Sequence, residues 1–110
     1  MADKDLILSK ASAVRRHLKR VRDKSDIKPT EFLKDPDRQD IIIFNLQMAI
    51  QNCIDIAAHL ISAEGMGMPA GASEMFLLLE EHGYLNQELA EKMIKTVGFR
   101  NLLVHEYSHV

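Results

Sequence analysis

The sequence predicts an all-α protein, folded as an up-and-down helical bundle. Two observations predict this class. Apolar residues recur at three- and four-residue spacings through most of the chain, and no run of alternating apolar residues is flanked by hairpin turns. With 110 residues the chain fits a single domain, residues 1–110, because single cores divide only above about 250 residues.

Composition excludes several classes of protein. Hydrophobic residues make up 46% of the chain and charged residues 27%, as in a globular protein and unlike a disordered chain. The single cysteine, Cys53, cannot form an internal disulfide, which excludes the disulfide-stapled secreted class. No apolar run approaches the roughly 18 residues of a membrane-spanning helix, and the polar N-terminus does not resemble a signal peptide. We therefore expect a soluble, cytoplasmic protein.

The first helix is expected from about Asp5 to Arg22. Its apolar positions follow the helical spacing: Leu8, Ala11, Val14, Leu18 and Val21. Residues 24–34 contain Pro29 and are of mixed polarity, which predicts a connection with one loose turn.

Positive charge is concentrated in this first segment. Between Lys10 and Lys28 eight basic residues stand against two acidic ones, so the segment carries +6, while the net charge of the whole chain is -2. The basic residues are Lys10, Arg15, Arg16, Lys19, Arg20, Arg22, Lys24 and Lys28. Such asymmetry is typical of a surface that faces a polyanion, although a solvated helix face has the same pattern.

The second helix has the sharpest predicted start. Asp35 is expected to cap it and Pro36 to occupy its first position, and it continues to about Glu64, roughly 40 Å at 1.5 Å per residue. Its apolar residues lie on more than one face. A helix in so small a domain can bury only one side against its own chain, so a second apolar side predicts a homodimer formed through the long helices.

The remaining elements are shorter. Residues 65–71 form a glycine-rich loop, which lacks the preceding strand and following Gly-Lys of a phosphate-binding loop. Ser73 is expected to cap a third helix that stops at Gly83, and Asn86 to cap a fourth that runs, with a bend at Gly98, to Tyr107.

A polar stripe interrupts the second helix. Asn45, Asn52 and His59 recur every seven residues, with Asp55 nearby, and so share one face. The stripe either faces water or makes hydrogen bonds between helices. Asp55 is of most interest, because an idle carboxylate among apolar neighbours would be costly.

Residues 105–109, His-Glu-Tyr-Ser-His, match the pattern of two histidines one turn apart with an intervening glutamate that zinc hydrolases use. A third ligand normally follows further along, and here the sequence ends one residue later. We therefore expect neither a metal nor any other cofactor, and a zinc hydrolase remains a minor alternative.

A second set of polar residues lies on the last helix, where Arg100, Asn101, His105 and Tyr107 follow one another. Arg100 and Tyr107 project about 20° apart and Arg100 and His105 about 140° apart, so a cleft between two copies could collect both residue types. A histidine can transfer a proton near neutral pH, and an arginine can stabilise charge on phosphorus. Together they suffice for metal-free RNA cleavage by the 2′-hydroxyl. The alternatives are a packed histidine and a surface salt bridge.

The segment Arg100-Asn101-x3-His105-x-Tyr107 resembles the signature motif of the HEPN superfamily in the form of HepT-like toxins. Residues 97–99 and 54–61 are similar to that subfamily as well, so the resemblance covers most of the chain from the second helix onward. It implies a homodimeric helical bundle that acts as a metal-independent endoribonuclease, the toxin of a type VII-like toxin–antitoxin pair. Its partner would be a minimal nucleotidyltransferase antitoxin.

The resemblance also implies residue roles. Arg100 and His105 would be catalytic, Asn101 and Asp55 supporting, and Tyr107 both supporting and the site of adenylylation by the antitoxin. Members of the family generally continue into another helix, which we expect this chain to lack. A non-catalytic bundle that serves a nucleotidyltransferase as partner or nucleotide-binding subunit is the alternative, and Arg100 with His105 favours the enzyme.

Overall fold

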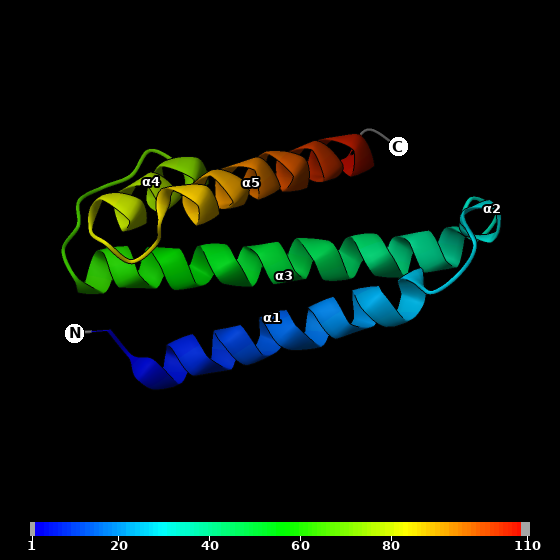
Figure 1. Ribbon diagram of the computed structural model, residues 1–110, viewed down its shortest axis with the longest axis horizontal. Coiled ribbons are helices and arrows are strands. Elements are labelled where there is room, and N and C mark those ends of the chain that lie inside the picture. Colours follow the sequence, from blue (N-terminus) through cyan, green and yellow to red (C-terminus); the bar gives the residue numbers. More distant parts are fainter. Residues whose placement is uncertain (1, 109–110) are drawn as a thin grey trace.

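The computed structural model describes the backbone of residues 2–108 and the side chains of residues 2–105. Within that range it contains helices and no strand, which confirms the predicted all-α class. The helices are α1 (Lys4–Ser25), α2 (Pro29–Phe32), α3 (Pro36–Ala63), α4 (Ala72–Glu81) and α5 (Gln87–Ser108). The molecule measures 47 × 28 × 25 Å, with α3 in the middle, α1 along one side and α4 with α5 along the other (Figure 1).

Most helix ends follow their local sequence signals. The Asp35 carboxylate accepts a hydrogen bond from the Arg38 backbone N–H at 3.0 Å and Pro36 begins α3, as expected. The Asn86 side chain accepts from the Leu89 N–H at 2.8 Å, which confirms it as a cap. Gly83 follows the C-cap of α4 with φ of +81°, a conformation that glycine adopts without strain.

The expected cap at Ser73 is wrong. Helix α4 begins at Ala72, and its N-cap, two residues before Ser73, is Gly71, which has no side chain to accept a hydrogen bond. The Glu74 carboxylate accepts a hydrogen bond from the backbone N–H of Ala70, the residue before the N-cap, at 3.0 Å. Helix α5 runs as one helix through Gly98 to Ser108.

The apolar core lies between α3, α4 and α5. Its buried residues are Ile50, Ile54, Ala57, Ile61, Met66, Phe76, Leu79 and Val97. Helix α1 contains no buried residue and packs along the opposite side of α3 through half-buried side chains. The bundle is therefore closed by apolar burial on one side of α3 and by a long, partly polar seam with α1 on the other.

Helix α3 corrects one expectation. An 18-residue window within Pro36–Ala63 has a mean hydropathy of 1.4, so the helix meets the length and composition test for a membrane span. The middle helix of a bundle passes the same test when it contacts neighbours on both sides, and α3 lies between α1 and the α4–α5 pair. The apolar residues of α3 thus have an explanation in the packing of this fold.

Candidate active site

The candidate residues of the last helix lie on the C-terminal half of α5. Arg100 is half-buried, and Asn101 and His105 are exposed. The backbone of Tyr107 belongs to the same helix, but its side chain lies outside the described residues. The described residues of the motif are therefore presented at the surface and not enclosed in the core.

Arg100 reaches from α5 across to α3. Its Nη2 donates a hydrogen bond to Oε1 of Gln51, and its Nη1 donates to Oδ1 of Asn101 at 3.0 Å. A guanidinium has five fixed N–H donors, so these two bonds orient the group and leave further donors for a ligand. Asn101 thus supports Arg100 through the hydrogen bond between their side chains.

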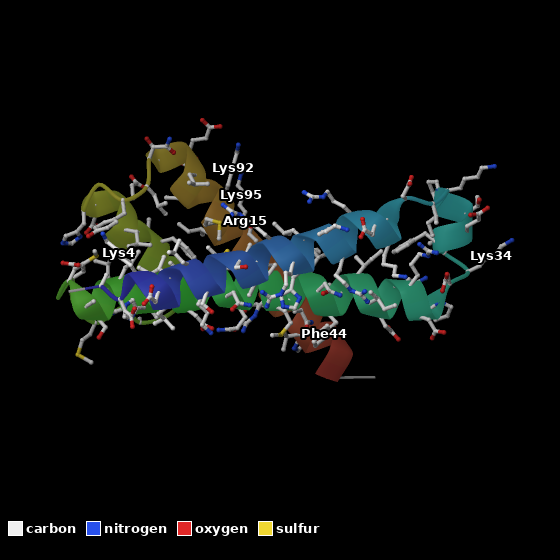
Figure 2. The ribbon with its side chains drawn as sticks, turned by 90° about the horizontal axis from the view of Figure 1, so that it is seen from below. Lys4, Arg15, Lys34, Phe44, Lys92 and Lys95 are labelled. Carbon is white, nitrogen blue, oxygen red and sulfur yellow. The ribbon has the colours of Figure 1, made fainter. Side chains whose placement is uncertain are left out.

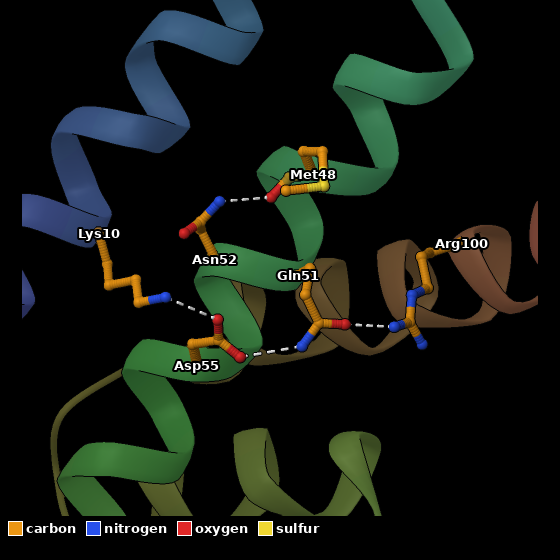
Figure 3. A network of polar contacts seen from close by, with 6 residues as sticks. All are labelled: Lys10, Met48, Gln51, Asn52, Asp55 and Arg100. Carbon is orange, nitrogen blue, oxygen red and sulfur yellow. Dashed lines mark hydrogen bonds and ion pairs between the residues drawn. The ribbon is translucent and has the colours of Figure 1, made fainter.

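The contact of Arg100 continues as a chain of polar groups through three helices (Figure 3). Nε2 of Gln51 donates to Oδ1 of Asp55 at 2.9 Å, and Nζ of Lys10, from α1, donates to Oδ2 of Asp55 at 3.1 Å. Arginine can only donate and a carboxylate can only accept, so the Gln51 amide must point its oxygen at Arg100 and its nitrogen at Asp55. The four side chains form one ordered relay, which we call the arginine relay: Lys10, Asp55, Gln51 and Arg100.

Asp55 is charged in this setting. Partial burial by itself would raise the pKa of this carboxyl, but hydrogen bonds from Gln51 and Lys10 and the positive charges of Lys10 and Arg100 outweigh it. The pKa of Asp55 therefore lies below its ordinary value. The sequence indicated that an unpaired carboxylate at this position would be costly. In the structure Asp55 is paired, because it lies at the seam between α1 and α3 and binds Lys10 there.

Residues 14–110 match the family described as Ribonuclease HepT-like. The chain belongs to the HepT-like ribonuclease family. The suspected resemblance to HEPN proteins of the HepT type is therefore confirmed, and with it the helical fold.

Two curated relatives of this HepT-like chain are nucleases. The mRNA nuclease HepT of Shewanella oneidensis is 33% identical over 106 residues, which cover 96% of this chain and 79% of the relative. The tRNA nuclease HepT of Aphanizomenon flos-aquae is 30% identical over 105 residues, which cover 96% of this chain and 71% of the relative. The two relatives share a family and differ in the RNA named as their target.

Solved structures of toxins from toxin–antitoxin complexes have the same fold as this chain. A tri-AMPylated Shewanella oneidensis HEPN toxin in complex with an MNT antitoxin has a TM-score of 0.87 and 34% identity, over 96% of this chain and 78% of that one. A toxin–antitoxin structure with AMP-PNP has a TM-score of 0.88 and 32% identity, over 97% of this chain and 80% of that one.

The polar stripe of the HepT-like chain serves mainly to hold α1 on α3. The side-chain N–H of Asn45 donates a hydrogen bond to the Ile41 carbonyl. Its side-chain oxygen accepts a hydrogen bond from Nδ1 of His17 on α1 at 2.8 Å. His59 accepts the Asp3 backbone N–H at 2.8 Å. The hypothesis of hydrogen bonds between segments is thus confirmed for Asn45 and His59.

Asn52, the middle residue of the stripe, hydrogen-bonds within its own helix. Its amide N–H donates to the Met48 carbonyl at 2.7 Å (Figure 3). Asn52 is buried, yet none of the stripe residues contacts Arg100. The stripe is therefore structural, and the site residues are found on the neighbouring face of α3.

The zinc pattern of residues 105–109 lies mostly outside the described side chains. No group of three or more His, Cys, Asp or Glu side chains capable of holding a metal ion occurs among the described residues. His105 is exposed on α5, and His109, the second histidine of the pattern, lies outside the described residues.

Sequence reasoning missed two members of the arginine relay, Gln51 and Lys10. The spacing of Gln51 four residues before Asp55 places the two side chains on one helix face and was an available signal. Lys10 is 45 positions from Asp55, so only the packing of α1 on α3 brings them together.

Proposed function

We propose that this chain is the toxin of a type VII-like toxin–antitoxin system and that it cleaves RNA without a metal ion. The observation that carries the proposal is the presentation of Arg100 and His105 at the surface of α5, with Arg100 held by α3, in a chain of a ribonuclease family. The substrate class follows from the relatives, whose names give mRNA and tRNA as their targets.

The chemistry assigns one task to each side chain. The His105 imidazole accepts the proton of a ribose 2′-hydroxyl, whose oxygen then bonds to the adjacent phosphorus. The bond from phosphorus to the 5′-oxygen breaks, and the departing oxygen takes back a proton from the imidazolium. The Arg100 guanidinium stabilises the charge that builds on the phosphate oxygens. The products are a 2′,3′-cyclic phosphate and a 5′-hydroxyl, and DNA is spared because it lacks the nucleophile.

The site is proposed to be completed by a second copy of the chain. Arg100 and His105 lie about 140° apart around α5, so two copies facing each other bring one residue of each type into a common cleft. The same stretch of helix exposes Phe99, Leu102 and Val104, at 48%, 57% and 45%. An apolar surface of this kind supports a homodimer contact beside the motif.

The proposed partner that silences the toxin is a minimal nucleotidyltransferase antitoxin, which adenylylates Tyr107. The support comes from the structural relatives, one of them a tri-AMPylated HEPN toxin in complex with an MNT antitoxin. We place the protein in the cytoplasm, where its RNA substrates and the ATP for modification occur together.

The proposed activity is tested with purified protein and a single-stranded RNA in the presence of EDTA. We expect cleavage that leaves 2′,3′-cyclic phosphate ends, and no cleavage of a DNA strand of the same sequence. Mass spectrometry of the products identifies the ends. Cleavage that stops in EDTA and returns with added Mg²⁺ or Zn²⁺ would contradict a metal-independent mechanism.

The arginine relay gives a second prediction. Gln51→Leu removes the acceptor that orients Arg100, so kcat is expected to fall about ten-fold or more. A hydrogen bond to a charged group contributes about 1.5–3 kcal/mol, and about 1.4 kcal/mol corresponds to ten-fold in rate. Steady-state cleavage of a fluorescent RNA measures the change. Gln51→Asn, which keeps the amide on a shorter side chain, should recover part of the rate.

Gln87→Leu is the matched control for this experiment. Gln87 also donates to a carboxylate four residues along its helix, that of Glu91 at 3.1 Å, but it lies at the opposite end of α5 from the motif. Its loss should leave kcat unchanged. Equal rates for Gln51→Leu and Gln87→Leu would remove Gln51 from the site.

A further inference from the structure

A groove lies beside α1, outside the residues proposed to do the chemistry. It has a volume of about 480 Å³ and is lined by Arg16, His17, Lys19, Arg20, Asp23 and Asn45. Three of these side chains are cationic and one is anionic. The groove is therefore the place where the positive charge concentrated in α1 surrounds a concave surface.

Two of its three cations, Arg16 and Arg20, make no close ion pair with the residues that the structure describes, although the charge of Arg20 also acts on Asp23. Lys19 pairs with Asp23 at 2.9 Å, which uses the one acidic group of the groove. Arg16 and Arg20 are exposed, and neither makes a hydrogen bond or an ion pair with any residue that the structure describes. Separated by four residues, they lie one turn apart on the same face of α1. Two adjacent guanidinium groups in this position suit phosphate oxygens.

An exposed aromatic ring adjoins the groove. The His17 ring, held by its hydrogen bond to Asn45, meets the Phe44 ring edge-on, with centroids 6.4 Å apart and planes at 79°. Phe44 is 57% exposed. Figure 2 shows it projecting from α3. An aromatic face beside unpaired cations is the combination with which proteins bind single-stranded nucleic acid: bases stack on the ring while cations follow the backbone.

This surface continues to the proposed catalytic arginine. Phe44 and Gln51 are seven residues apart on α3, so they share one face and are separated by about 10 Å along the helix axis. Gln51 in turn holds Arg100. Figure 2 shows Phe44 and the C-terminal end of α5 on the same side of the layer formed by α1 and α3.

We infer that these residues form a track for single-stranded RNA that leads to the catalytic arginine. Arg16 and Arg20 bind the phosphates of nucleotides beside the cleavage site, and Phe44 stacks on a base between them and Arg100. The inference rests on the proposed ribonuclease function and adds to it a binding site on α1 and α3 outside the motif. The charge of the groove and the exposed ring favour single-stranded RNA, because phosphates can meet the cations while a base stacks on the ring.

The first experiment measures binding. His105→Ala protein, which cannot cleave, is titrated into a fluorescently labelled twelve-nucleotide RNA, and anisotropy is followed at several salt concentrations. We expect Arg16→Glu/Arg20→Glu to weaken binding at least ten-fold. The slope of log K against log salt should fall by about 1.4, at about 0.7 for each lost contact with a single strand. Phe44→Leu keeps an apolar side chain and loses the ring, and should weaken binding about ten-fold with the slope unchanged.

Arg15→Glu/Arg22→Glu is the matched control, because it makes the same change of charge on the same helix. Arg15 and Arg22 share a face about 140° from Arg20, and Figure 2 shows Arg15 on the side away from Phe44. The control should keep the wild-type salt slope. Equal binding by the two double variants would overturn the track.

The second experiment separates the track from the chemistry. A dinucleotide occupies only the cleavage site, so kcat/KM for a dinucleotide should be unchanged in Phe44→Leu and in Arg16→Glu/Arg20→Glu, while kcat/KM for the twelve-nucleotide RNA falls at least ten-fold. If the wild-type protein cleaves no RNA, the proposed function fails, and the anisotropy titration still decides whether the track binds RNA.

The remaining outcomes also decide the inference. Mass measurement in solution is made on every variant. If Phe44→Leu or Arg16→Glu/Arg20→Glu dissociates the protein into smaller species and RNA binding falls in parallel, the surface is a contact between copies and the track is wrong. If RNA binding is unchanged and binding to a purified nucleotidyltransferase antitoxin is lost, the groove receives a protein, and the track is wrong as well.

Discussion

Arg100→Ala and His105→Ala are each expected to reduce cleavage of single-stranded RNA at least about 100-fold. A preorganised group that stabilises transition-state charge contributes about 100- to 1000-fold, and a positioned acid or base about 100- to 10,000-fold. Both side chains lie at the surface of α5 and outside the core, so neither change should disturb folding. Rates are measured in EDTA, and far-UV circular dichroism should give the same helicity as the wild type.

Two further variants sharpen this experiment. Arg100→Lys keeps the positive charge and loses the planar fork, so it should recover little activity if two oxygens are contacted together. Lys95→Ala removes an exposed cation from the same helix and should cleave at the wild-type rate. Wild-type rates in both Arg100→Ala and His105→Ala would end the assignment of the site. Loss of activity in only one of them would assign the chemistry to that residue alone.

Adenylylation of Tyr107 is expected to abolish cleavage almost completely. Tyr107 follows Arg100 by seven residues, so the two positions share a face of α5 about 10 Å apart along its axis. An added adenylyl group places a bulky anion beside the site where the substrate phosphate must bind, and like charges repel there. The protein is treated with ATP and a cognate nucleotidyltransferase, the modified residue is located by mass spectrometry, and RNA cleavage is then measured.

The chain offers a matched control for this experiment, since it contains two tyrosines. Tyr84, the other one, is 48% exposed and lies between α4 and α5, away from the motif. Tyr84→Phe should be modified and silenced like the wild type, whereas Tyr107→Phe should escape modification and stay unsilenced by the treatment. Modification at Tyr84, or full activity of protein modified at Tyr107, would show that the silencing proposal is wrong.

The sequence predicted the helices well where the signal was local. Asp35 with Pro36, Asn86 and Gly83 each mark a helix end through their own backbone chemistry, and the structure uses all of them. Ser73 failed because α4 begins at Ala72, so Ser73 lies inside the first turn and Gly71 takes the N-cap position. A preference for serine as a capping residue does not fix the residue at which a helix begins.

Part of the candidate site could be predicted from the sequence, and part depends on how the helices pack. The motif of α5 could be named from its residue types and spacing, and Asp55 from the improbability of an unpaired carboxylate in an apolar stretch. Gln51, Lys10 and His17 acquire their roles only when α1, α3 and α5 pack, because each contact joins residues 28 to 49 positions apart. Such contacts depend on the register between helices, which no single helix specifies.

The seam between α1 and α3 has a consequence for catalysis. Helix α1 buries no residue completely and packs on α3 through half-buried side chains, several of them polar. The ion pair between Lys10 and Asp55 joins α1 to Arg100, because Gln51 hydrogen-bonds to both Asp55 and Arg100. The proposed catalytic arginine is therefore positioned in part by a helix that carries none of the motif residues.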